Sequence, residues 1–308
     1  MAGAGARGRT RGQLTVARAG VEGLLARCTF PPAGVPVTCA VSGGADSLAL
    51  LVLAVAAGCN VTAVHVDHGL RPGSAAEADV VATAAGQYGA TFRAATALVD
   101  PGPNLEARAR AARYAALPDD VLTGHTADDQ AETVLLNLLR GAGLDGLAGM
   151  APGRHPLLRV RRRETRAFCE VEGLEPVDDS SNDDLSFRRN RVRAELVPLL
   201  DQIAERDVAS VISRQTELLR HDAELLELLS AEIDPTDAKA LADAPPALAR
   251  RAVRRLLAND HPPDSAAVER VLAVARGEAV ATDAGGGRHV RRSRGRLAVV
   301  VQASLRRR

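Results

Sequence analysis

The segment AVSGGADSLALL (residues 40–51) places two glycines, two serines and an aspartate between two apolar stretches. Upstream, VPVTCAV (35–41) is β-branched and uncharged, which predicts a buried strand. Downstream, leucines and valines recur at the spacing of an amphipathic helix from Ser47 to Ala57, and Gly58 predicts the end of that helix. A strand, a tight polar loop and a helix N-terminus in this order direct backbone N–H groups and a helix dipole at the loop, where an anion can bind.

The composition of this loop suits a pyrophosphate. It lacks the lysine of the common phosphate loop G-x-x-x-x-G-K-[ST], and Lys239 is the only lysine in the chain. Glycines let the backbone approach an anion, serines donate hydrogen bonds, and Asp46 can hold Mg²⁺ between phosphate oxygens. The alternative is an ordinary turn with Asp46 or Ser47 as the helix N-cap. The full S-G-G-x-D-S pattern favours phosphate binding by Ser42, Gly43, Gly44, Ala45, Asp46 and Ser47.

The order of the apolar segments predicts an α/β fold with a parallel, doubly wound sheet. Further strands are expected at 61–66, 91–96, 120–124 and 156–160, and helices at 75–88, 105–117, 127–140 and 162–172. Strands that alternate with helices imply right-handed crossovers and helices on both faces of the sheet. Ligands of such folds bind beyond the carboxyl ends of the strands, where the loops 42–47, 67–71 and 124–129 all fall.

Beyond about residue 186 the pattern becomes mostly helical, which predicts a second, smaller domain. Residues 194–229 are expected to be nearly all helix, and the arginine-rich end of the chain is expected to form a two-stranded hairpin or small sheet. We expect an N-terminal extension and leading helix at 1–34, a catalytic domain at 35–205, and a helical linker with a C-terminal domain at 206–308.

Composition narrows the class of protein. Aromatic residues make up 2% of the 308 residues, with no tryptophan, which argues against base stacking on an aromatic sheet. The net charge of +1 says nothing about nucleic acid. The cysteines (Cys28, Cys39, Cys59 and Cys169) form no C-x-x-C pair, so we expect buried thiols rather than a zinc or iron–sulfur site. The chain has no apolar run of membrane-spanning length, so we expect a cytoplasmic protein without a membrane partner.

An acidic group is expected at the mouth of the helix predicted after residue 126. His125, Asp128, Asp129 and Glu132 fall in one sector at about 100° per residue, opposite the apolar face. Carboxylates on the phosphate side of the sheet can bind Mg²⁺ or receive a cationic substrate. A solvated helix N-terminus enriched in acids is the alternative.

Basic residues follow two other predicted elements. His68 and Arg71, after the strand at 61–66, are placed to meet a phosphate or a base, and Arg113 lies on the helix at 105–117. The run RRNRVR places four arginines, Arg188 among them, around an asparagine near the domain junction, a composition that suits a polynucleotide backbone. The residues of this run that we assign to RNA are Arg189, Asn190, Arg191 and Arg193.

Together these motifs make the chain similar to the tRNA(Ile)-lysidine synthetase family, a branch of the PP-loop (N-type ATP pyrophosphatase) enzymes. The resemblance covers roughly residues 38–200 in order and spacing, and S-G-G-x-D-S alone marks only the superfamily. The more specific motifs are HVDHGLR, ARAARY, GHTADDQAETVLLNLLRGAGLDGLAGM, PLL at 156–158 and SSN…RRNRVR…LVPLL. Two features depart from the family: a short segment between Arg113 and His125, and His155 where the family usually has arginine.

The resemblance implies a ligase that forms a C–N bond in two steps. ATP adenylates the 2-oxo group of the wobble cytidine of a tRNA(Ile) with a CAU anticodon, and the amine of free L-lysine then displaces AMP. ATP and Mg²⁺ are the implied cofactors, and a homodimer is left open. The implied catalytic residues are Asp46, Arg113, His125 and Asp129, with Asp46 as the metal ligand. The loop 42–47 with His68 and Arg71 would bind ATP, and Asp128, Asp129 and Glu132 would bind lysine.

Three other classes compete with this interpretation. A tRNA sulfur transferase of the same superfamily would need cysteine pairs. A glutamine- or ammonia-using ligase, such as an NAD or GMP synthetase, would not need the basic junction or the extra domain. A nucleotide-binding regulator would bind ATP without releasing pyrophosphate, and the fold alone cannot separate these classes.

Overall fold

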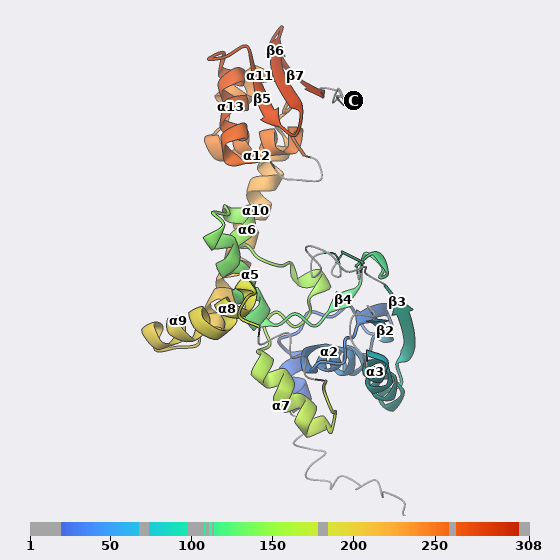
Figure 1. The fold of residues 1–308 in the computed structure, drawn as a ribbon. Coiled ribbons are helices and arrows are strands. Elements are labelled where there is room, and N and C mark those ends of the chain that lie inside the picture. Colours follow the sequence, from blue (N-terminus) through green and yellow to red (C-terminus); the bar gives the residue numbers. More distant parts are fainter. Residues whose placement is uncertain are drawn as a thin grey trace, which may run out of the picture. The chain divides into compact units, whose positions relative to one another are not determined.

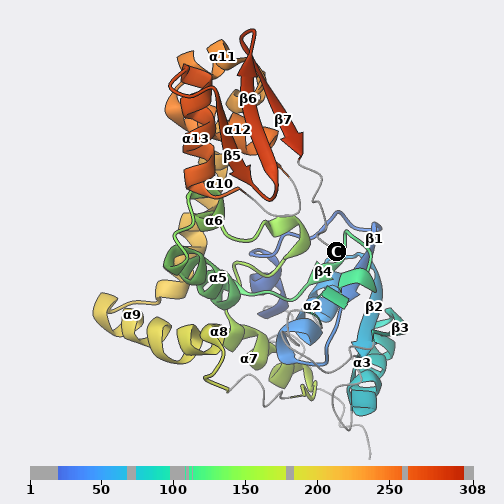
Figure 2. The same ribbon diagram turned by 45° about the horizontal axis from the view of Figure 1, so that its top comes forward.

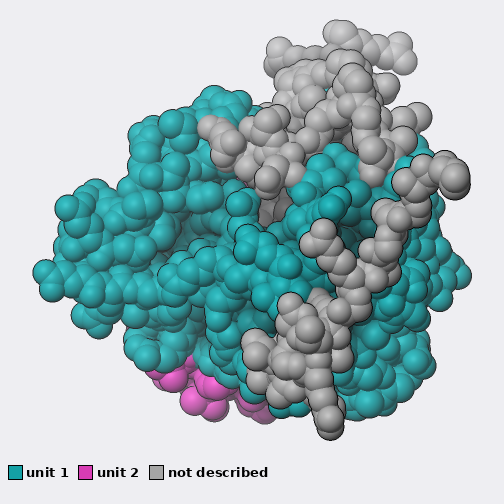
Figure 3. Space-filling model, turned by 90° about the horizontal axis from the view of Figure 1, so that it is seen from below, with its two compact units in different colours: residues 1–217 teal, residues 218–308 magenta. Residues whose placement is uncertain are grey.

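The computed structural model describes residues 20–67, 74–97, 108, 111–112, 114–177, 184–258 and 263–301. The chain divides into two compact units, residues 1–217 and residues 218–308, which are shown in different colours in Figure 3. Among the described residues, no helix has both the length and the apolar character needed to cross a bilayer.

The first unit is built on a four-stranded parallel sheet (Figure 1). Its strands are β1 (Pro36–Ala40), β2 (Asn60–Asp67), β3 (Thr91–Thr96) and β4 (Leu122–Thr123), in the order β3-β2-β1-β4. The helices that alternate with them are α2 (Ala45–Ala56), α3 (Ser74–Tyr88), α5 (Ala127–Leu139) and α7 (Arg162–Glu172). The predicted α/β class and parallel sheet are confirmed. Of the predicted helix at 105–117, residues 105–107, 109–110 and 113 lie outside the described residues.

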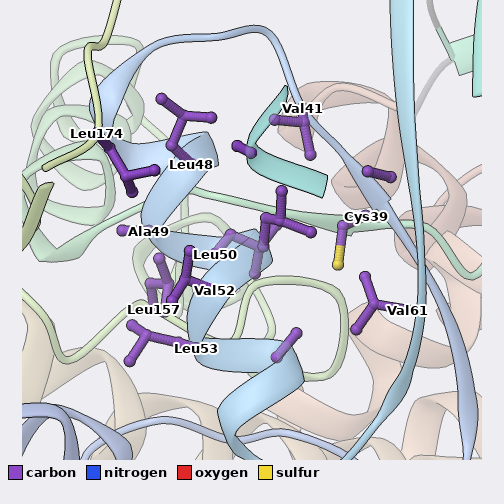
Figure 4. Packing of buried hydrophobic residues seen from close by; sticks show 14 of the residues in the cluster. Cys39, Val41, Leu48, Ala49, Leu50, Val52, Leu53, Val61, Leu157 and Leu174 are labelled. Carbon is purple, nitrogen blue, oxygen red and sulfur yellow. The ribbon is translucent and has the colours of Figure 1, made fainter. Parts of the chain in front are cut away.

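Helix α2 forms the centre of the hydrophobic core (Figure 4). Leu48, Leu50, Leu51 and Leu53 have no exposed surface, and every residue from Ser47 to Ala54 is buried. The prediction of an amphipathic helix was therefore wrong, because α2 packs on β1 and β2 and is also covered by α3 and α7. A helix with no solvated face fixes its own N-terminus rigidly, which matters for the loop that precedes it.

The prediction of a fifth strand at 156–160 was wrong, because this segment forms consecutive turns. Leu157 and Val160 are fully buried, but the Val160 N–H donates to the Leu157 carbonyl 2.8 Å away and the Leu158 N–H to that of His155. Short apolar runs predict burial more reliably than they predict the backbone conformation. The short helices α6 (Leu144–Leu147) and η1 (Pro152–Arg154) precede this segment.

The long helix expected at 194–229 is broken into several elements. They are α8 (Arg188–Arg191), the π-helix η3 (Val192–Leu196), α9 (Val197–Ala204) and α10 (Val208–Ala231). The break after α9 is at Glu205, whose φ of 49° is left-handed. Helix α8 and the π-helix pack beside α5 (Figures 1 and 2).

The second unit has its own core between three helices and a small sheet. The helices are α11 (Ala238–Asp243), α12 (Pro246–Leu256) and α13 (Ser265–Arg276). The predicted small sheet has three antiparallel strands: β5 (Ala281–Gly285), β6 (Arg288–Ser293) and β7 (Arg296–Val301). Leu241, Val253, Leu257 and Val271 are buried between these layers.

Gly124 gives a test of how tightly the sheet edge packs on α2. A Cβ atom at this position would lie 2.6 Å from the Asp46 carbonyl oxygen and 2.8 Å from its carbon, which are backbone atoms that cannot turn away. We expect Gly124→Ala to lower the free energy of unfolding by about 1–3 kcal/mol, as overpacking does. In α3, a Cβ at Gly86 meets nothing within 4 Å, so Gly86→Ala should stabilise by up to about 1 kcal/mol. Equal unfolding midpoints of the two variants in urea would contradict this packing.

Candidate active site

The loop between β1 and α2, which the sequence predicts to bind phosphate, is closed by its own two serines. The Ser47 hydroxyl donates to the Gly44 carbonyl at 2.8 Å and accepts from the Ser42 N–H at 3.1 Å, and the Ser42 hydroxyl lies 3.2 Å from it. Gly43 has a φ of +91°, and its carbonyl accepts from the Val177 N–H. Gly44 is the N-cap and supplies no side chain, so neither Asp46 nor Ser47 is the cap. The first N–H groups of α2, which have no acceptor within the helix, remain for an anion.

Asp46 points from the first turn of α2 to the first turn of α7. One of its carboxylate oxygens accepts from the Thr165 hydroxyl, and the other lies 3.3 Å from Arg162 Nε. The side chain of Asp46 is 25% exposed. Burial raises the pKa of this carboxyl to about 6, and the hydrogen bond from Thr165 opposes the shift only in part. Asp46 is therefore a carboxylate whose charge lacks a full complement of protein donors, as a metal ligand would be.

Asp128 is held by the beginning of α7. Its two oxygens accept from Arg161 Nη2 at 2.9 Å and Nε at 3.0 Å, and one also accepts from the Arg162 N–H at 2.7 Å. Burial opposes ionisation of Asp128, but these donors hold its pKa below the usual range. Arg161 also pairs with Asp207, which precedes α10. Asp128 thus joins α5 to the N-terminus of α7.

Asp129 and Glu132 lie deeper, on the same helix. Asp129 completes a capping box with Thr126, whose N–H and hydroxyl both lie 2.9 Å from one carboxylate oxygen. Burial would raise the pKa of Asp129, but the positive charge of Arg162, the largest of the opposing causes, outweighs it and the pKa falls below its usual range. Glu132 is only 1% exposed. This carboxylate is therefore nearly excluded from water and depends on protein donors for its charge.

The donors to Asp129 and Glu132 are arginines from two other segments. Arg162 lies 2.9 Å from Asp129 and 3.2 Å from Glu132. Arg189 Nε and Arg193 Nε each lie 2.7 Å from a different oxygen of Glu132, and Arg189 Nη2 lies 3.0 Å from Asp129. The structure therefore brings together two groups of residues that the sequence assigned to different ligands, the acids to lysine and the arginines to RNA.

The other residues of the RRNRVR run have different surroundings. Asn190 is buried and donates to the Asp184 carbonyl at 2.9 Å. Arg191 is exposed and pairs with Glu195 one turn further on. Among the arginines assigned to RNA, Arg191 alone faces away from the acidic group.

Two histidines share one hydroxyl at the end of β4. The Nδ1 atoms of His125 and His155 both lie 2.6 Å from the Thr123 hydroxyl oxygen, and the rings meet edge to face with centroids 4.8 Å apart. Since a hydroxyl donates only one hydrogen, at least one of these rings must carry a proton on Nδ1. His155, the departure from the family pattern, is therefore a direct neighbour of the predicted catalytic residue His125.

Comparison with known proteins finds a matching family model in each of the two units. Residues 25–200 match the family model of a PP-loop domain, and residues 237–298 match that of a TilS substrate binding domain. A tRNA(Ile)-lysidine synthase of Nocardia farcinica is 42% identical over 316 residues, which covers 93% of this chain and 98% of that protein. One from Rhodococcus erythropolis is 46% identical over 240 residues, covering 72% of this chain and 73% of that protein. The chain belongs to the tRNA(Ile)-lysidine synthase family.

A solved structure agrees with the fold of the family. The U34-tRNA thiolase NcsA of Methanococcus maripaludis, solved with its [4Fe-4S] cluster, has a TM-score of 0.53 and 19% identity, and the match covers 69% of this chain and 81% of that one. This likeness supports the PP-loop architecture and nothing beyond the fold. The resemblance on which the sequence analysis relied is confirmed.

The cysteines distinguish this chain from a sulfur carrier. All four are free thiols, and three of them (Cys39, Cys59 and Cys169) are buried. Burial raises the pKa of Cys28, Cys39 and Cys169 to about 12, so these groups are neutral thiols at physiological pH. Because the thiolate is the reactive form, sulfur relay by these residues is disfavoured.

Three predicted site residues, His68, Arg71 and Arg113, lie outside the described residues. Sequence analysis missed three others that contact the acids directly: Arg161, Arg162 and Thr165. A signal for them was present, because RRRET places three arginines at the beginning of a predicted helix, where the helix dipole disfavours positive charge. Arginines at such a position indicate acidic partners from elsewhere in the chain.

Asp46 allows a test of the balance between stability and function. Because the pKa of Asp46 in the folded protein, about 6, lies above the ordinary pKa of an aspartate, ionised Asp46 lowers stability above about pH 6, and this cost disappears below about pH 4. At pH 8 without nucleotide or metal, we expect the free energy of unfolding of Asp46→Asn to exceed that of the unchanged protein by up to about 3 kcal/mol. The variant should therefore unfold at a higher temperature. At pH 4 the two unfolding temperatures should converge. A lower unfolding temperature of Asp46→Asn at pH 8 would contradict the burial argument.

Proposed function

We propose that this chain ligates L-lysine to the wobble cytidine of a tRNA(Ile) with a CAU anticodon, with cleavage of ATP to AMP and pyrophosphate. The observation that carries this proposal is that the phosphate-binding loop and a group of acids on α5 lie at the same edge of the sheet and are joined through Asp46, Arg162 and Asp129. Membership of the family, across nearly the whole chain, supports the same reaction.

The first step needs a site for a leaving pyrophosphate. The cytidine 2-oxo oxygen forms a bond to the α-phosphorus while the bond from that phosphorus to the bridging oxygen breaks. The loop Ser42–Ser47 supplies backbone N–H groups, hydroxyls and the dipole of α2 where negative charge develops. Arg113 is our candidate to compensate the phosphate of the adenylated cytidine.

Asp46 fits the role of a magnesium ligand. Magnesium typically takes one or two protein carboxylates, with waters and substrate phosphates completing its shell. A lone carboxylate beside a phosphate loop meets this requirement, and within the described residues no set of three or more His, Cys, Asp or Glu side chains forms a complete metal site. When bound, Mg²⁺ would neutralise phosphate charge.

The second step needs a cationic substrate to be held as one of its amines attacks. The attacking amine must first lose a proton; its nitrogen then bonds to C2 of the cytidine as the bond from C2 to the adenylate oxygen breaks. We assign the lysine seat to Asp129 and Glu132, because Asp128 already serves as the anchor of α7. His125 lies one residue before the N-cap of α5 and is the candidate to accept the proton.

The overall reaction is tested by incubating the protein with radiolabelled lysine, ATP, Mg²⁺ and bulk tRNA, followed by nucleoside analysis. The proposal predicts labelled lysidine and release of pyrophosphate that requires tRNA. Incorporation of sulfur, or pyrophosphate release that depends on glutamine or ammonia without tRNA, would indicate one of the competing classes.

Two charge-preserving substitutions separate the roles of the acids. Glu132→Asp withdraws the carboxylate from the seat by one methylene, and we expect the KM for lysine to rise at least about tenfold, a loss of about 1.4 kcal/mol of binding. The KM for ATP should change little. Asp128→Glu makes the matched change at the anchor and should lower the unfolding temperature without changing the KM for lysine. The assignment is wrong if Asp128→Glu has the larger effect on that KM.

The arginines at 291–296 differ in their surroundings, since Arg292 and the exposed Arg296 are both paired with other residues of this unit. Arg292 donates to the Ala275 carbonyl at the end of α13, and Arg296 pairs with Asp234. Arg291 and Arg294 are exposed. We therefore expect Arg291→Glu with Arg294→Glu to weaken tRNA binding and to reduce its salt dependence by about two units of slope, because contacts with phosphates are lost. Binding is measured by filter retention from low to high salt. An unchanged slope would show that this face of the sheet does not bind RNA.

A further inference from the structure

The lysine seat is filled by the protein's own arginines. Glu132 accepts from Arg162, Arg189 and Arg193, and Asp129 accepts from Arg162 and Arg189. Resting on the proposed function, we propose that Arg189 and Arg193 are exchangeable counter-ions of this seat. They occupy it in the free enzyme, and one of the two leaves it for a phosphate of an incoming substrate, which opens the seat for the lysine ammonium.

Charge balance requires such an exchange. The connected group contains three carboxylates, Asp46, Asp129 and Glu132, and three guanidinium groups, Arg162, Arg189 and Arg193. An ammonium added to this neutral group would have no compensating charge in a site largely withdrawn from water. The carboxylate oxygens are also already occupied, since each oxygen of Glu132 accepts from two guanidinium groups. Lysine can therefore bind only if a guanidinium group gives up its place.

Exposure and anchoring distinguish the arginines that leave from the one that stays. Arg162 is 19% exposed and contacts all three carboxylates. Arg189 and Arg193 are 33% and 29% exposed and contact only the acids of α5 within this group. Arg193 also lies in the π-helix Val192–Leu196, a rare and weak backbone form that is found frequently at functional sites. The two more exposed arginines are thus the exchangeable pair.

A phosphate is the partner that matches a released guanidinium. The planar fork of arginine binds phosphate in two parallel hydrogen bonds, as it binds carboxylate, so the exchange replaces one anion by another of similar geometry. Both the tRNA and ATP bring phosphates to the site. With either source, lysine would bind after the phosphate-bearing substrate, and its affinity would be higher in the presence of that substrate. By linkage, lysine would strengthen the binding of that substrate by the same factor.

The test measures binding of radiolabelled lysine to the full-length protein by equilibrium dialysis. It is made without additions, with tRNA(Ile) transcript, and with a non-hydrolysable ATP analogue and Mg²⁺. We expect lysine affinity to rise at least about tenfold with one of these additions, which identifies the source of the phosphate. Arg193→Gln and Arg189→Gln should raise lysine affinity in the absence of both additions and make it less dependent on them. Arg193→Lys, which keeps the charge, should retain the dependence.

Arg163→Gln is the matched control, because Arg163 is an exposed arginine that pairs with Asp207. It should leave lysine binding unchanged in all three conditions. Weaker lysine binding by folded Arg193→Gln, as checked by thermal unfolding, would overturn the proposal, as would equal lysine affinity with and without both additions. If the unchanged protein neither binds lysine nor forms lysidine under any condition, the proposed function itself fails. If it forms lysidine normally but its lysine affinity does not depend on tRNA or the ATP analogue, only the exchange is contradicted.

Discussion

The ionic contacts around Glu132 are the interaction on which the catalytic unit depends. This almost fully buried carboxylate of α5 joins Arg162 of α7 to Arg189 and Arg193 of the segment that follows residue 184. Those elements are separated in sequence by 30 to 61 residues, and no continuous strand ladder joins them. Removing one partner of a buried pair costs about 3–5 kcal/mol, because the other charge is left without compensation. Each acid and arginine of this group thus depends on the others for charge compensation.

The same contacts place opposite demands on stability and on chemistry. The proposed seat for a cationic substrate places carboxylates away from water, and in the free protein arginines of the same unit compensate their charge. Asp46 differs from the acids of α5, because its charge is only partly compensated by Thr165 and Arg162 and burial raises its pKa to about 6. Stability is lowered at the residue that we propose as the magnesium ligand, and such a cost is typical of functional positions. The carboxylates of the proposed seat on α5 are therefore fully paired with arginines, whereas the carboxylate of Asp46 is not.

Local patterns in the sequence predicted much of the fold. The bounds of α7 agree with the prediction residue for residue, and the glycine that ends α2 lies where the periodicity stops. The segment 156–160 failed because apolar side chains bury equally well from a strand or from turns. The partners of Asp129 and Glu132 could not be predicted, since ion pairs between distant segments follow no sequence period. The arginines at the beginning of α7 did carry a signal, because their charge opposes the helix dipole. The roles of the predicted site residues remain predictions.

The fold by itself does not decide the chemistry of a PP-loop enzyme. The thiolase with a similar fold has a [4Fe-4S] cluster, whereas the cysteines here are free and mostly buried. Beyond the carboxyl ends of the strands of this chain, α5 contributes acids and α7 contributes arginines. Because the phosphate loop needs only backbone N–H groups and a few small side chains, it can be kept while the second substrate changes. Asp46, Arg162 and Asp129 connect this loop to the acids of α5, so under the proposed function the charges that the fold holds beside the loop specify the acceptor site.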